Sequence, residues 1–243
     1  MRPFCRLWHE AIKTYRTVNT VRLLLLGIVV GVLSGAGAIV FFAGVEGIRF
    51  LLLTKLAGMS LPAPAGEELF HGHAGPSRPW LIPVFTTGVG LITGLLVYKW
   101  IPDTHANGTD GTDSMIKSFH RLGGLIKPVV PLIKSGTAIL TIASGGSAGR
   151  EGPISQMGAG FGSWLSTRMG LTAKERRILL LSGAAGGLGA IFRAPLGGAL
   201  TAIEVIYRED FETEALLPAV ISSVVSYTLF TLVFGTDPIF GIP

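Results

Sequence analysis

The chain has 243 residues, of which 49% are hydrophobic and only 14% are charged. Soluble domains carry roughly 25% charged residues, so this composition, with its mean hydropathy of +0.56, excludes an ordinary soluble domain and indicates an integral membrane protein. The excess positive charge of +5 sits at the ends of apolar segments. That position favours membrane topology over nucleic-acid binding. The single cysteine, Cys5, excludes an internal disulfide.

The N-terminal part of the chain predicts a basic segment followed by two membrane spans. Residues 1–21 are rich in Arg and Lys, so we expect a cytoplasmic N-terminal segment there. The first span is predicted at 22–45, and its apolar pattern continues to Leu53. This run is long enough to cross a bilayer, which favours a transmembrane helix over a cleaved signal peptide. A polar loop over 56–79, predicted to be external, separates it from a second span at 80–101.

The rest of the chain alternates between polar turns and short apolar segments. In order, the pattern predicts an amphipathic helix at 113–122 capped by Asp113, an apolar segment at 129–143, a helix from Pro153 to Thr167, a span rich in small residues at 178–191, a helix over 192–207 and a last span at 216–234. The segments 153–167 and 192–207 are short, because a full crossing needs about 20 residues. Short or broken membrane helices usually surround a substrate site. Gly183–Gly189 is interpreted as a close helix contact.

The stretch "GREGP", residues 149–153, places Arg150 beside Glu151 between apolar segments. Pro153 suits the first position of a helix, and a helix N-terminus attracts anions through unpaired N–H groups and partial positive charge. Gly149 and Gly152 let the backbone approach a ligand closely, and Arg150 adds full positive charge. Glu151 competes with a diffusing anion for this place, so we predict that it gates the site and accepts protons.

A second anion-attracting loop is predicted in "ANGTDGTD", residues 106–113. Its candidate ligands are Thr109, Asp110, Gly111 and Thr112. The threonine hydroxyls can donate hydrogen bonds to an anion. The carboxylates of Asp110 and Asp113 argue against an anion site, and Asp113 is interpreted as a solvent-facing helix cap. A third helix start carries Arg193, which is either an anion-attracting or a structural residue. Glu204, near the end of that helix, is interpreted as structural or as part of an interface.

Three other readings receive less support. Ser147 lies in "GGSAG", which has the G-x-S-x-G form of a hydrolase elbow, but this motif needs a strand, a turn, a helix and a base. His71 and His73 stand near Glu67 and Glu68, yet two histidines in a flexible loop are weak evidence for a metal, and we predict no metal site. A third alternative function, a non-conducting membrane interaction subunit, stays open. Because the hydrolase motif lacks its required context, we expect no enzyme activity.

The motif "GREGP" at 149–153, followed by "ISQMGAGFGS", resembles the gating-glutamate motif of the ClC family of chloride channels and chloride/proton exchangers. The block 184–205, "AAGGLGAIFRAPLGGALTAIEV", resembles that family's next motif. The resemblance covers roughly 20–240 and implies an all-α polytopic membrane protein, here the first inverted repeat with its tilted and broken helices. It also implies that Glu151 is the external gate, that chloride is the transported ion and that no cofactor is needed.

The same resemblance implies a homodimer whose interface lies in the helices 192–207 and 216–234, in the plasma (inner) membrane. The family's serine loop, G-S-G-I-P, is replaced here by "TDGTD", 109–113, so its central serine is not evident. Val205 stands where exchangers carry an internal glutamate, which favours a voltage-gated channel and leaves a chloride/proton antiporter as the alternative. We expect a transmembrane half-domain at 22–235 and a linker, 236–243, toward a missing second half or a second chain.

Overall fold

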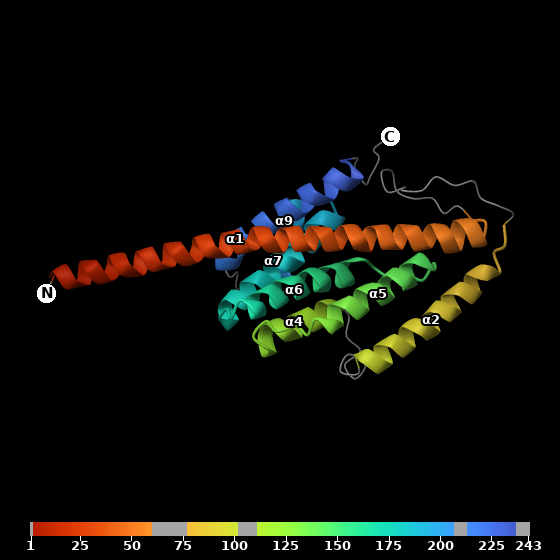
Figure 1. The fold of residues 1–243 in the computed structure, drawn as a ribbon, viewed down its shortest axis with the longest axis horizontal. Coiled ribbons are helices and arrows are strands. Elements are labelled where there is room, and N and C mark those ends of the chain that lie inside the picture. The colour runs from red at the N-terminus through yellow and green to blue at the C-terminus, as the bar shows by residue number, and fades with distance from the viewer. Residues whose placement is uncertain (1, 60–76, 102–110, 207–212, 237–243) are drawn as a thin grey trace.

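A computed structural model describes residues 2–59, 77–101, 111–206 and 213–236, and this part of the chain contains helices and no strands. In order, the elements are α1 (Arg2–Arg49), the π-helix η1 (Phe50–Leu56), α2 (Leu81–Trp100), α4 (Gly111–Arg121), α5 (Val129–Ala143), α6 (Glu151–Arg168), α7 (Ala173–Ile191), α8 (Pro195–Glu204) and α9 (Thr213–Phe234). Figure 1 shows α1 running along the bundle and projecting beyond it at its N-terminal end. The predicted all-α class is confirmed.

Three helical segments of the described chain are long and apolar enough to cross a membrane: Thr20–Leu56, Leu81–Trp100 and Glu214–Phe234. The second and third agree with the spans predicted at 80–101 and 216–234. The first is longer than the predicted 22–45. Because the sequence has no proline between Pro3 and Pro62, nothing interrupts the helix, and it continues through residue 21 without a break.

The centre of the bundle is the antiparallel pair α6 and α7, which approach through glycines. A methyl group built on Gly158 would meet the backbone carbonyl of Gly183, and the reverse holds equally. One turn further along, Gly162 lies in the same way against Leu179. The side chains from Ile178 to Ile191 are all buried. The prediction that these small residues pack helices together is confirmed by this contact.

Helices α1 and α9 cross through a second series of small residues, spaced four apart on both helices. Methyl groups built on Gly27, Gly31 and Gly35 would lie 3.1 Å from Pro218 O, 3.0 Å from Ser222 Cα and 3.1 Å from Ser226 Cα. Residues four apart share one helix face, so this face of α1 admits the α9 backbone along three turns. In contrast, α2 has no buried residue and lies at the edge of the molecule (Figure 1).

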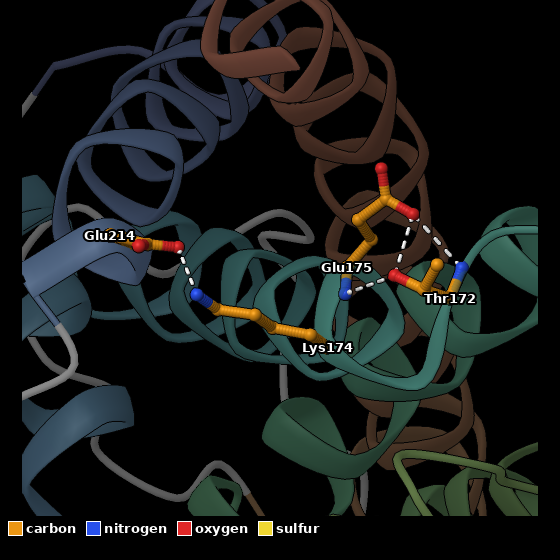
Figure 2. A network of polar contacts seen from close by, with 4 residues as sticks. All are labelled: Thr172, Lys174, Glu175 and Glu214. Atoms are coloured by element: carbon orange, nitrogen blue, oxygen red, sulfur yellow. Dashed lines mark hydrogen bonds and ion pairs between the residues drawn. The ribbon is translucent and has the colours of Figure 1, made fainter. Parts of the chain in front are cut away.

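A polar network joins the starts of α7 and α9 (Figure 2). Thr172 caps α7: its hydroxyl accepts from the Glu175 N–H, while the Glu175 carboxylate accepts from the Thr172 N–H at 2.9 Å. Burial raises the pKa of Glu175, but the hydrogen bonds from Thr172 and the positive charge of Arg22 outweigh it, so this pKa is lowered. Lys174 pairs with Glu214 at 2.6 Å, which ties α7 to α9 at the surface.

Candidate functional site

The motif "GREGP" forms the start of α6, as predicted, but two residues earlier than predicted. Arg150 is the N-cap, Glu151 is the first helical residue and Pro153 is the third. The Ile154 N–H donates to Arg150 O at 3.2 Å and is the first bond of the helix. Proline is accepted here because N–H groups of a first turn lack intrahelical acceptors anyway. The prediction that Pro153 opens the helix was therefore wrong by two positions.

The first turn of α6 has backbone N–H groups without intrahelical hydrogen-bond partners, so this end of the helix carries partial positive charge. Within the described residues, the N–H groups of Glu151 and Gly152 have no backbone hydrogen-bond acceptor. Gly152 is buried, whereas the side chain of Glu151 is exposed and stands at the opening of the first turn. Open space surrounds Gly149, since a methyl group built there would have no neighbour within 4 Å. The arrangement can hold an anion on backbone N–H groups, with the carboxylate beside it.

The second predicted loop meets the first one. Helix α4 begins at Gly111, and a methyl group built there would lie 2.7 Å from the carbonyl carbon of Gly152. Thr112 follows, half-buried, in the same first turn. Asp113 lies exposed inside this turn, two residues after the helix start, so the prediction that it caps the helix was wrong. Thr109 and Asp110 lie outside the described residues.

A buried glutamine that the motif analysis passed over lies at this junction. Gln156 is 0% exposed, and neither its Oε1 nor its Nε2 has a hydrogen-bond partner. Its Oε1 would lie 3.2 Å from a methyl group on Gly111. The sequence holds one indication that Gln156 is unusual: it is the only glutamine, and it stands among small and apolar residues.

The third predicted helix start is found at Pro195, the first residue of α8. Arg193 precedes it with φ 52°, a left-handed conformation that is rare for a residue with a side chain. Because Gly187 of α7 lies against Ile154 of α6, the end of α7, with Arg193, is at the same end of the helix pair as Glu151. Glu204 closes α8 and is exposed.

The hydrolase reading of Ser147 is contradicted by the local structure. Helix α5, ending at Ala143, precedes the serine where the elbow motif requires a strand. The chain turns at Gly145, with φ 92°, before it reaches Ser147. The serine therefore lacks the sharp strand-to-helix turn that exposes such a nucleophile.

A family model described as voltage gated chloride channel matches residues 89–243. The chain belongs to the voltage-gated chloride channel family. An uncharacterised protein from Methanocaldococcus jannaschii is 37% identical over 162 residues, which cover 67% of this chain and 38% of that protein. The voltage-gated ClC-type chloride channel ClcB of Escherichia coli O139:H28 is 29% identical over 216 residues, covering 89% of this chain and 48% of ClcB.

The fold of the voltage-gated chloride channel family is also present. The crystal structure of a slow cyanobacterial Cl⁻/H⁺ antiporter superposes with a TM-score of 0.68 at 25% identity, covering 89% of this chain and 48% of that one. The chain thus spans about half, or less, of the length of the relatives it matches. ClcB is named as a channel and the cyanobacterial protein as an antiporter, and the chain is an integral membrane protein of that family.

Proposed function

We propose that this chain supplies one half of a chloride pathway across a membrane and that Glu151 gates it. The observation that carries the proposal is the meeting of α4 and α6: Gly111 lies against Gly152 at the start of both helices. Two helix N-termini that lie side by side concentrate partial positive charge there. The relatives named for chloride transport agree with this chemistry.

The proposed mechanism is passive permeation through a dehydrated site. The anion exchanges part of its water shell for the N–H groups of Glu151 and Gly152, and the charge of Arg150 adds to the attraction. The Glu151 carboxylate competes for the same place and leaves it when protonated or displaced. Val205, at the end of α8, offers no carboxylate for an internal proton route, so we favour a channel. A chloride/proton antiporter is the alternative, because one structural relative has that activity.

We infer that a second half, or a second polypeptide, covers the exposed side of Glu151. We also infer a homodimer through α8 and α9, as the family resemblance implies. Such an interface would cover exposed leucines of both helices, which are Leu196, Leu200, Leu217 and Leu232. The proposed orientation has a cytoplasmic N-terminus in the plasma (inner) membrane, and no cofactor takes part. Sequencing the coding region beyond Pro243 separates a continuous second half from a separate partner.

The test is chloride efflux from proteoliposomes, with a pH electrode recording proton movement. The protein is purified with any polypeptide that accompanies it. Glu151→Gln and Glu151→Ala are expected to give efflux that is less gated and free of proton coupling. Glu214→Gln, an exposed acid paired with Lys174, is the matched control and should behave as wild type. Intact gating in both Glu151 variants contradicts the proposed gate, and absent efflux in wild type favours a non-conducting subunit.

A further inference from the structure

Gln156 is a fully buried polar side chain without a partner in the described part of the chain. It is 0% exposed, and both Oε1 and Nε2 lack a hydrogen bond. Buried amides are nearly always hydrogen-bonded, because leaving one unpaired costs free energy. The described residues therefore leave a place for a partner that none of them supplies.

The position of the amide indicates what that partner is. Gly152 and Gln156 stand four residues apart and so share one face of α6. Helical side chains lean toward the helix N-terminus, which brings the amide back toward the first turn. There its Oε1 would lie 3.2 Å from a methyl group on Gly111, the first residue of α4. The amide thus lies against the first residue of α4, near a helix N-terminus, where an anion is electrostatically favoured.

A carboxamide has two N–H donors and one acceptor oxygen. Half a turn of its terminal bond exchanges the oxygen and the nitrogen, so the NH₂ group can face the anion. We propose that the side-chain amide of Gln156 donates a hydrogen bond to the permeating halide at the junction of α4 and α6. This inference rests on the proposed function, because it names a ligand of the same anion site.

The direct test observes the amide itself. The protein, with any accompanying polypeptide, is labelled with glutamine carrying ¹⁵N at Nε2 and studied by NMR in lipid bilayers. The chain has one glutamine, so the signal missing from Gln156→Met, or from Gln156→Asn if methionine prevents folding, belongs to Gln156. Chloride is titrated against gluconate at constant ionic strength. We expect a saturable shift with chloride alone; no shift, or an equal shift with gluconate, overturns the proposal.

A second measurement follows transport. Gln156→Met keeps the side-chain volume and removes the donor, so the chloride concentration for half-maximal efflux should rise about tenfold. Thiocyanate, which needs hydrogen-bond donors less, should gain permeability relative to chloride. Ser226→Ala is the control, since Ser226 is also fully buried and unpaired but lies between α1 and α9. An unchanged permeability ratio in folded Gln156→Met contradicts the inference.

The two proposals fail in different ways. If wild-type protein transports chloride but the Gln156 signal does not respond, the ligand assignment is wrong and the pathway stands. If the signal responds to chloride but no efflux occurs, the site binds anions and the transport proposal is wrong.

Discussion

Gly111 and Gly152 meet at the first turns of α4 and α6, so closely that a methyl group on Gly111 would lie 2.7 Å from the Gly152 carbonyl carbon. Contacts below about 3.0 Å force a shift of one partner, and here that partner is backbone rather than a flexible side chain. The approach of the two helix starts therefore depends on the absence of a side chain at this position.

Gly111→Ala is expected to separate α4 from α6. Overpacking of this kind costs about 1–3 kcal/mol, and the free energy of unfolding in detergent should fall by that amount. Chloride efflux should fall as well, since the two N-termini would no longer lie together. Gly90→Ala is the control: Gly90 also lies in a helix, but nothing stands within 4 Å of a methyl group there. Equal behaviour of the two variants would show that the helix contact is not needed.

A second glycine contact, between α6 and α7, should matter for stability in the same way. Gly158→Ala would push a methyl group into the backbone carbonyl of Gly183, and we expect unfolding to become easier by about 1–3 kcal/mol. Gly136→Ala in α5 has open space instead and should change the unfolding free energy little. Denaturant titrations of both variants decide this; a harmless Gly158→Ala would mean that the helices separate readily.

Most helices could be predicted from the sequence because long apolar runs specify them. The segment 129–143 was predicted with the bounds that α5 has. The starts of α4 and α6 were each placed two residues late. Asp113 and Pro153 both favour a cap or first position, yet both are also accepted inside the first turn, so local preference could not fix the boundary.

Only those features of the candidate site that lie close together in the sequence could be predicted. "GREGP" indicated a helix start with a charged pair, and Glu151 is the first residue of α6. The contact between Gly111 and Gly152 joins distant segments, and no local pattern contains it. Gln156 was missed for the same reason: a lone glutamine becomes informative only when its burial and its missing partner are known.

The cap of α7 predicts a pH-dependent stability. Thr172→Ala removes the hydroxyl that accepts from the Glu175 N–H, and loss of such a cap costs about 1 kcal/mol. The pKa of Glu175 is lowered in the folded protein from its ordinary 4.5, so the carboxylate's contribution is present above pH 4.5 and is lost as the pH falls below it. The melting temperatures of wild type and Thr172→Ala should therefore differ most at neutral pH and converge in acid.

The neighbouring ion pair provides the comparison for that experiment. Lys174 and Glu214 are more than half exposed, and exposed pairs contribute about 0–1 kcal/mol. Lys174→Ala should thus lower the melting temperature less than Thr172→Ala, and added salt should erase its effect. A larger effect from Lys174→Ala would mean that the link between α7 and α9, rather than the cap, stabilises this end of the bundle.

Arg193 closes α7 in a conformation that glycine would adopt more readily. The N–H of Arg193 donates to Ala190 O and the N–H of Ala194 donates to Gly189 O, both at 3.2 Å. These two hydrogen bonds form the Schellman motif, in which a residue in the left-handed conformation ends an α-helix. With φ 52°, a β-carbon costs about 1 kcal/mol or more. Arg193→Gly should therefore unfold less readily than Arg193→Ala by about that amount, although both lose the same guanidinium group.

The same pair of variants separates the backbone role of Arg193 from its charge. If the guanidinium attracts anions toward the end of the helix pair that carries Glu151, both variants should lower chloride efflux equally, because neither carries the charge. If Arg193 is structural, efflux should follow stability, with Arg193→Gly close to wild type and Arg193→Ala below it. Efflux and unfolding measured on the same preparations therefore decide between the two roles.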